Sequence, residues 1–382
     1  MTLSDAASST PILFDLDLLQ PGRDEAHVID KLIAKLRTNN EWTFKKFGHG
    51  LRDAHSKSHA VLRGTLIVDE HLDPPLAQGL FAEPGKSYDV IARISSTFPT
   101  IRSDQIRGIR AIALKVLGVD DPRARPDNAS NQDFVLVNHD TFPYAGAKSY
   151  LRQGMAAAWM LTRVPDCLLK PSTEALAALD AVFHLPLPAA ARLLILPNYH
   201  ILGFTFSTAS ALRYGDYVAK ISLVPSSPSV LKLMRALITR RGGSDAHRLL
   251  IKEFFAANSA EYEMHVQLCT DPRVIEDARM PWTGPSQPVA KLVFDQQMSD
   301  CFCARVYADD VLSFNSWTAM QAHTPLGSIN RLKAKVYDAS SEFRHGKNNA
   351  PRVEPTSITE LPSCTPNARP CASGRQESCD DS

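Results

Sequence analysis

The chain has 382 residues and a formal net charge of +1 at pH 7, with 42 Lys and Arg against 41 Asp and Glu. This balance excludes a strong overall attraction to nucleic acid or to an anionic membrane, so a small molecule is the expected partner. With 44% hydrophobic residues the composition is that of a soluble globular protein. The longest apolar stretches, such as residues 189–197, fall well short of a bilayer span, and no secretory signal is recognisable at residues 1–10. A cytoplasmic protein without a membrane span is therefore expected.

Cysteine usage gives no sign of a metal site or a redox motif. Four cysteines are scattered and three lie near the C-terminus: Cys167, Cys269, Cys301 and Cys303, then Cys364, Cys371 and Cys379. No C-x-x-C pair occurs, which supports neither a structural zinc site nor a thioredoxin-like motif. Reduced thiols are expected.

The first part of the chain predicts a helical arm followed by strands. Apolar residues at helical spacing predict a helix over residues 25–48. Short runs rich in Val, Ile and Leu, separated by Pro, Gly and Asp, predict strands at residues 60–68, 87–96, 109–119 and 133–138. Their spacing is typical of an antiparallel sheet or barrel.

The second part predicts helices inserted between further strands. Many Ala and Leu indicate a helical excursion over residues 145–196. The remaining expected elements are strands at residues 214–224, 261–269 and 288–294, a helix at 231–257, and a closing helix at 327–343. Residues 351–382 are rich in Pro, Ser, Thr and Asp and lack apolar periodicity, which predicts a poorly ordered tail.

Polar residues interrupt the apolar strand pattern at four places. They occur at residues 52–57, 93–96, 107–115 and 131–133. Singly, an arginine there is explained by a solvated strand end or a surface ion pair, and Ser95 or Asn131 by a satisfied turn. Together the four places predict a functional site.

In this order the four segments resemble motifs of the haem catalase superfamily, in particular its shorter catalase-like members. Arg52-Asp53-Ala54-His55-Ser56-Lys57 is similar to the Arg-x-x-His-Ala-Lys segment that carries the distal histidine of catalases. Residues 93–96 resemble Arg-Phe-Ser-Thr, and residues 107–115 resemble Arg-Asp-Pro-Arg-Gly-Phe-Ala-Val-Lys. The family's distal asparagine falls on Asn131. The resemblance covers roughly residues 45–349.

The resemblance extends to the proximal side of the haem. Catalases ligate the iron through a tyrosine that is followed by Arg, Gly and Asn seven, nine and eleven residues later. Tyr337 meets these offsets with Arg344, Gly346 and Asn348. Lys333, Tyr337 and Arg344 would share one helix face, and a nearby cation favours the phenolate form of a tyrosine. Taken alone, this segment is better explained as an ordinary helix surface with a Tyr beside an Arg.

The resemblance implies an α+β fold: a catalase-type antiparallel β-barrel with an N-terminal helical arm and surrounding helices. Residues 1–44 would form the arm, 45–349 the haem domain and 350–382 the tail. The implied cofactor is haem b, ligated by Tyr337 and held by a set of basic residues: Arg52, Arg93, Arg110, Lys333 and Arg344. His55 would act as the distal base on hydrogen peroxide or an organic hydroperoxide, with Ser95 fixing its ring and Asn131 holding the peroxide. A homo-oligomer smaller than the usual catalase tetramer, such as a dimer, is expected.

Three departures from the family pattern leave alternatives open. Lys333 stands where catalases carry Arg, and Ala54 stands where they carry Val and coral allene oxide synthase carries Thr. The segment from His55 to Gly64 is one residue longer than in catalases, which makes His59 a rival to His55; His55 is preferred because Arg52 and Lys57 keep their offsets. The alternatives are a non-enzymatic haem carrier or sensor, a hydroperoxide-isomerising enzyme related to allene oxide synthase, and a haem-free structural protein.

Overall fold

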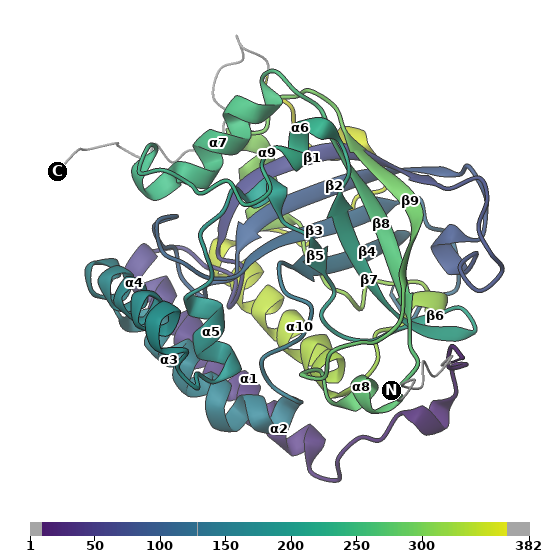
Figure 1. Ribbon diagram of the computed structural model, residues 1–382, viewed down its shortest axis with the longest axis horizontal. Coiled ribbons are helices and arrows are strands. Elements are labelled where there is room, and N and C mark those ends of the chain that lie inside the picture. The colour runs from purple at the N-terminus through teal and green to yellow at the C-terminus, as the bar shows by residue number, and fades with distance from the viewer. Residues whose placement is uncertain (1–9, 128, 365–382) are drawn as a thin grey trace, which may run out of the picture.

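An antiparallel β-barrel forms the centre of the protein in the computed structural model, which describes residues 10–127 and 129–364 (Figure 1). Eight of the described strands close the barrel, and β6 extends the hairpin formed with β7. The strands are β1 (Lys57–Val68), β2 (Ser87–Ser96), β3 (Arg110–Leu117), β4 (Asn131–Val137), β5 (Phe206–Ser207), β6 (Leu212–Tyr214), β7 (Tyr217–Pro225), β8 (Ala260–Leu268) and β9 (Ser286–Phe294). The predicted α+β class and antiparallel barrel are confirmed.

The barrel is closed by a short seam. β5 pairs with β4 through a single residue pair, Val137 opposite Ser207, and with β7 through two. By contrast, β1 and β2 pair along almost their whole lengths. The seam therefore contributes the fewest ladder hydrogen bonds of any junction in the barrel.

Apolar side chains from alternate strand positions fill the barrel. Leu62, Leu114, Leu136, Ile221 and Leu292 are all at most 1% exposed and belong to one cluster. Side chains of a strand point alternately to its two faces, so one residue in two reaches this interior. Full burial of each such side chain contributes about 1.5–3 kcal/mol, which makes the barrel the main stabilising unit.

A β-bulge accounts for the extra residue predicted after His55. The register of β1 against β2 shifts between Ser58 and Ala60, so His59 is the additional residue on β1. A bulge accommodates one residue more than the partner strand and bends the strand locally.

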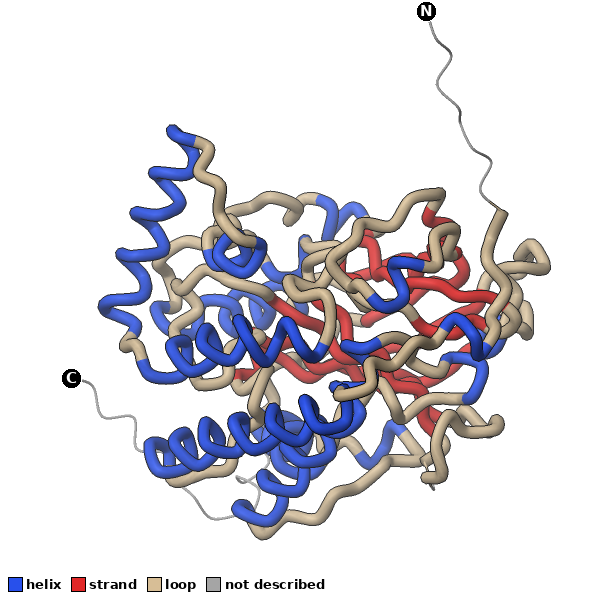
Figure 2. The backbone as a smooth tube through the Cα atoms, turned by 90° about the horizontal axis from the view of Figure 1, so that it is seen from below, coloured by secondary structure: helices blue, strands red, loops and turns tan. Residues whose placement is uncertain are grey.

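The helices gather mainly on one side of the barrel, where α1 to α5 and α10 lie together (Figures 1 and 2). Their bounds are α1 (Glu25–Phe47), α2 (Ala147–Ser149), α3 (Met155–Arg163), α4 (Asp166–Phe183), α5 (Ala189–Leu194), α6 (Pro228–Leu231), α7 (Ala246–Phe255), α8 (Arg273–Glu276), α9 (Phe302–Val306) and α10 (Ser328–Asn348). None of the helices within residues 10–127 and 129–364 is both long and apolar enough to cross a membrane.

The long helices α1 and α10 pack together and form the outer wall beside the barrel. Val28, Leu32 and Leu36 recur at helical spacing on α1 and are buried in one cluster with Leu332 of α10. Near the N-terminus of α10, Arg331 forms ion pairs with Glu25 at the start of α1 and with Glu276 at the end of α8. These contacts fix α10 in relation to both neighbours.

The prediction of one helix over residues 231–257 is wrong for its first half, which is not α-helical. α6 ends at Leu231 and α7 begins only at Ala246. Gly242 and Gly243 between them have φ angles of 81° and 52°. Such left-handed backbone interrupts an α-helix.

Residues 350–364 pack against the barrel, which corrects the predicted poorly ordered tail for this part. Leu361 is 1% exposed, and Val353 forms a parallel bridge with Leu312. The carboxylate of Glu354 accepts a hydrogen bond from buried Lys115 at 2.6 Å. Residues 365–382 of the predicted tail lie outside the described residues.

A disulfide joins Cys301, just before α9, to Cys364. The expectation of reduced thiols is therefore wrong for this pair, whereas Cys167 and Cys269 are free. Local sequence patterns do not reveal the pair, because the two cysteines are 63 positions apart and only folding brings their Cα atoms to 5.5 Å.

Removing this disulfide should destabilise the protein. In the chain-entropy description, closing a loop of this length stabilises the fold by about 4 kcal/mol, and measured values are commonly about 2–4 kcal/mol. We expect the double substitution Cys301→Ser with Cys364→Ser to lower the free energy of unfolding, measured by urea titration, by about 2–4 kcal/mol. Cys167→Ser, at an exposed free cysteine, is the control, and equal unfolding midpoints for the two variants would contradict the prediction.

Candidate functional site

A large cavity lies between the barrel and the helices α3, α5 and α10. Its larger part encloses about 1510 Å³ of empty space, some of it open to solvent, and is lined mostly by apolar side chains such as Phe98, Val137, Phe142 and Leu193. A smaller part of about 610 Å³ is lined by polar groups, including four arginines: Arg52, Arg93, Arg344 and Arg352. Both parts share His55 and Tyr337, so they adjoin each other at these side chains. Its size and mixed lining suit a cofactor-sized ligand.

His55 lies in the loop between α1 and β1, with an unusual backbone. Its φ is +59°, a left-handed conformation that costs a residue with a side chain about 1 kcal/mol or more. Two residues on the same face of β2 hold it: Arg93 Nη2 donates to the His55 carbonyl at 2.8 Å, and Ser95 Oγ lies 3.3 Å from His55 Nδ1. Within the described residues Nε2 makes no hydrogen bond. The predicted pairing of Ser95 with His55 matches this geometry.

The imidazole of His55 is held neutral by its surroundings. Burial, followed by the positive charges of Arg93, Arg52 and Lys333, lowers its pKa to about 3. The ring is therefore uncharged at any physiological pH and is able to accept a proton.

Three of the predicted arginines converge on one turn. Arg93 Nε donates to Asp309 Oδ1 at 2.8 Å, Arg52 Nη1 donates to the Asp309 carbonyl at 3.0 Å, and Arg344 donates to the same carbonyl. Asp309 belongs to a π-helical turn (Tyr307–Val311) that follows α9. Arg93 and, at 3.4 Å, Arg52 also contact the Asp309 carboxylate, whereas Arg344 contacts only the carbonyl, so this one carboxylate faces three guanidinium groups at the polar end of the cavity.

Tyr337 and Lys333 line the cavity from α10, one turn apart, as the helical spacing predicts. Burial and the nearby carboxyl group of Asp53 raise the pKa of Tyr337 above its ordinary value. Burial lowers the pKa of Lys333 to about 8, and its amine has no ion pair or hydrogen bond within the described part of the chain. The expected stabilisation of the phenolate by a neighbouring cation is thus not seen in the structure.

Arg110 was predicted to contact the cofactor but lies elsewhere. Its side chain is 1% exposed and donates to the carbonyl of Ile106 at 2.7 Å, Asn198 Oδ1 at 3.0 Å and Ser96 Oγ at 3.1 Å. These partners satisfy the guanidinium inside a buried network that does not line the cavity. This prediction is corrected: Arg110 is part of the support behind β2 and β3.

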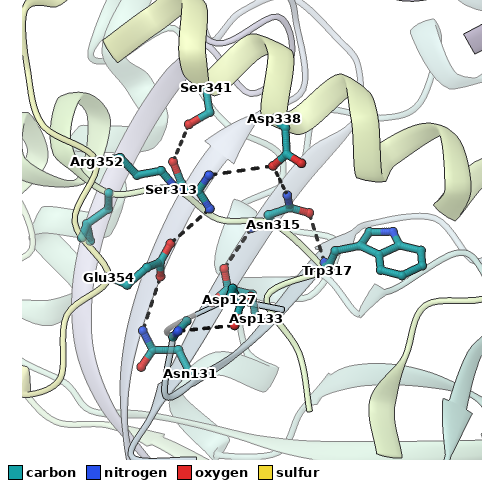
Figure 3. Close-up of polar contacts among 12 residues, drawn as sticks. Asp127, Asn131, Asp133, Ser313, Asn315, Trp317, Asp338, Ser341, Arg352 and Glu354 are labelled. Carbon is teal, nitrogen blue, oxygen red and sulfur yellow. Dashed lines mark hydrogen bonds and ion pairs between the residues drawn. The ribbon is translucent and has the colours of Figure 1, made fainter. Parts of the chain in front are cut away.

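Asn131 is also absent from the cavity wall. On β4 it pairs with Leu117, whereas the end of β4 level with Ser95 is Val137, opposite Ala111. Six residues of strand span about 20 Å, which separates Asn131 from His55. Its amide donates to Glu354 at 3.4 Å, beside Asp133, as Figure 3 shows. The structure does not bring Asn131 to the proposed peroxide position.

His59, the rival to His55, lies outside the cavity. It is fully buried, with Nε2 2.8 Å from Ser96 Oγ, and its ring packs edge-on against His247. Burial is the main reason why the pKa of His59 lies well below its ordinary value, and the nearby His247 and Lys57 lower it further. The geometry favours His55 over His59.

Sequence reasoning missed three polar residues of the site: Asp53 and Arg352, which line the cavity, and Asp309, which contacts its arginines. Asp53 stands within the recognised motif and offered a signal, since a carboxylate between Arg52 and His55 is unexpected in an apolar cavity. Arg352 lies in the segment expected to be poorly ordered and reaches Asp338 at 3.8 Å (Figure 3). Asp309 contacts Arg93 from 216 positions further along the chain, and no local sequence pattern identifies it as a residue of the site.

Asp53 should destabilise the protein at neutral pH. Burial raises its pKa to about 6, against the opposing effect of Ser340. A carboxyl group whose pKa is raised on folding stabilises the fold below its unfolded pKa of 3.8, and this contribution is lost as pH rises through about 6. We expect Asp53→Asn to raise the free energy of unfolding by about 1–2 kcal/mol at pH 7.5 and to change it little at pH 4.

The control is Asp30→Asn, at an exposed aspartate of α1, with both variants followed by urea titration at the two pH values. An Asp53→Asn effect of equal size at pH 4 and pH 7.5 would show that titration of this carboxyl group is not the cause.

Comparison with known proteins gives structural relatives only. No protein-family model and no curated protein match the sequence. A fungal catalase crystal structure matches with a TM-score of 0.57 at 14% identity, over 87% of this chain and 70% of the catalase. Catalase A from Saccharomyces cerevisiae matches with a TM-score of 0.55 at 15% identity, over 89% and 76%.

A bacterial catalase structure matches with a TM-score of 0.54 at 14% identity, over 93% of this chain and 70% of that one. At such identities the likeness concerns the fold. The chain therefore has the fold of the catalases: an antiparallel β-barrel with an N-terminal helical arm and surrounding helices.

Proposed function

We propose that the protein binds haem b in the cavity and acts on hydrogen peroxide or organic hydroperoxides. The observation that carries this proposal is that His55 and Tyr337, which are distant in sequence, line one apolar cavity whose polar end bears an arginine cluster. Haem b offers the complementary chemistry: an apolar ring, an iron centre and two carboxylates on one edge.

The residues present fit this group in two respects. A phenol oxygen is the catalase-type ligand for haem iron, and Tyr337 is the tyrosine that lines both parts of the cavity. The guanidinium groups of Arg52, Arg93 and Arg344 carry more positive charge than Asp309 neutralises, which suits two carboxylates. The raised pKa of Tyr337 is compatible with ligation, because a bound cation favours the deprotonated form of its ligand.

In this proposal His55 moves the proton. Bound haem iron supplies the redox chemistry at the peroxide bond. The neutral imidazole accepts the peroxide proton at Nε2 and returns it to the leaving oxygen, first as general base and then as general acid. Ser95 holds Nδ1 and Arg93 holds the backbone, so the ring keeps one orientation during both transfers.

The size of the cavity supports organic hydroperoxides as well as hydrogen peroxide. Ala54 has a small side chain beside His55, and the larger part of the cavity is apolar. An apolar lining gains free energy by excluding water around a hydrocarbon chain.

A second candidate is haem binding without rapid turnover. Two observations favour it: Asn131 does not line the cavity, and the Lys333 amine makes no hydrogen bond or ion pair within the described residues. Oxygen release from hydrogen peroxide by freshly haem-loaded protein separates the two functions.

Replacing the proposed ligand should change the haem spectrum. We expect haem-loaded protein to show a high-spin ferric absorption spectrum, and Tyr337→Phe to abolish or alter it, because the phenyl ring has no oxygen to ligate iron. Tyr217→Phe, on β7, is the matched control. A Tyr337→Phe spectrum identical to that of the control would remove Tyr337 from this role.

Replacing the proposed base should separate binding from turnover. We expect His55→Ala to retain haem while peroxide turnover falls by about 10²–10⁴-fold, the usual contribution of a positioned acid–base group. His71→Ala, at an exposed histidine, is the control, and oxygen release and the absorption spectrum are the measurements. Turnover that survives in His55→Ala would assign the proton transfer to another group.

A further inference from the structure

We propose that Asp309 is a positioning residue for His55 and acts on it through Arg93. The inference rests on the proposed function, since it concerns the residue assigned to proton transfer. It goes beyond that function by assigning a role to a carboxylate on a turn that contributes no side chain to the proposed chemistry.

The path from Asp309 to His55 runs through one guanidinium group. Arg93 Nε donates to Asp309 Oδ1 and its Nη2 donates to the His55 carbonyl, both at 2.8 Å. The side chain of Arg93 is 2% exposed, so neither contact is exchanged readily for water. The fork geometry of a guanidinium fixes the angle between the two contacts.

His55 needs such support because of its backbone. With φ at +59°, it occupies a region that residues other than glycine leave unless surrounding contacts hold them. The contact to its carbonyl holds the backbone, while Ser95 contacts only the ring. Losing the first contact would let the backbone relax and turn the ring away from the cavity.

Asp309 is itself fixed from several directions. Its second carboxylate oxygen accepts a hydrogen bond from Ser58 Oγ on β1 at 2.5 Å. Its carbonyl accepts from Arg52 in the loop and from Arg344 on α10. Although burial raises the pKa of Asp309, Arg93 and Arg52 outweigh that effect and keep it below the ordinary value, so the carboxylate stays charged.

The neighbouring Asp310 provides a matched control in the same turn. Its carboxylate lies 2.7 Å from His49 Nε2 and 3.2 Å from Asn348 Nδ2, and it makes no contact with Arg93 or His55 within the described residues. Asp309→Asn and Asp310→Asn are therefore the same chemical change on adjacent residues, and the proposal expects only the first to affect His55.

The first measurement needs no haem. In the full chain labelled with ¹⁵N-histidine, wild-type His55 should give the ring-nitrogen signals of one fixed neutral tautomer, assigned by their loss in His55→Gln. Asp309→Asn and Arg93→Lys should each move these signals towards tautomer averaging, and Asp310→Asn should leave them in place. His55 signals that are unchanged in Asp309→Asn, or that change equally in Asp310→Asn, would overturn the proposal.

The second measurement is peroxide turnover by haem-loaded protein. Asp309→Asn should lower kcat about 10- to 10²-fold with KM little changed, as expected for a misoriented group. The double variant Asp309→Asn with Arg93→Lys should lose no more than the worse single variant, because both act on one path. A double loss equal to the product of the single losses would overturn the proposal.

The two measurements separate this proposal from the proposed function. If haem-loaded wild-type protein fails to turn over peroxide, the proposed function fails, while the histidine signals still decide whether Asp309 positions His55.

Discussion

Three guanidinium groups that meet at one turn hold the two walls of the cavity in place. Arg52 comes from the loop before β1, Arg93 from β2 and Arg344 from α10, and all three contact Asp309. Removing one partner from such a buried set leaves a charge without compensation, at a cost of about 3–5 kcal/mol. Arg52 is three residues before His55, and Arg344 is two helical turns after Tyr337 on α10. The distance between the His55 and Tyr337 side chains therefore depends on the contacts of these arginines with Asp309.

Much of the architecture follows from local patterns in the sequence. Runs of Val, Ile and Leu between turn residues marked β1 to β4 and β7 to β9, and apolar spacing marked α1 and α10. The convergence of His55, Ser95, Arg93, Tyr337 and Arg344 was also predictable, although only through the resemblance of several collinear motifs. Strand periodicity alone gives no reason to join a loop before β1 to a helix near the C-terminus.

Other parts of the site depend on tertiary pairing that no local pattern encodes. Arg110 and Asn131 match family motifs, but strand register and hydrogen-bond partners decide where their side chains lie, and both lie outside the cavity. The segment at residues 350–364 has a disordered composition, yet a disulfide, Leu361 and Glu354 attach it to the barrel. Asp309 contributes only through partners that are far away in sequence.

The short seam at β5 has a consequence for how a bulky ligand reaches the interior. Val137, which forms the single pair between β4 and β5, also lines the cavity, as do Thr208 and Ala209 just after β5. Parting the barrel there breaks fewer hydrogen bonds than at any other junction, so local opening needs the least free energy at this wall. We therefore expect the amide hydrogens of the seam to exchange with solvent before those of the longer ladders, and a bulky ligand would enter the interior beside them.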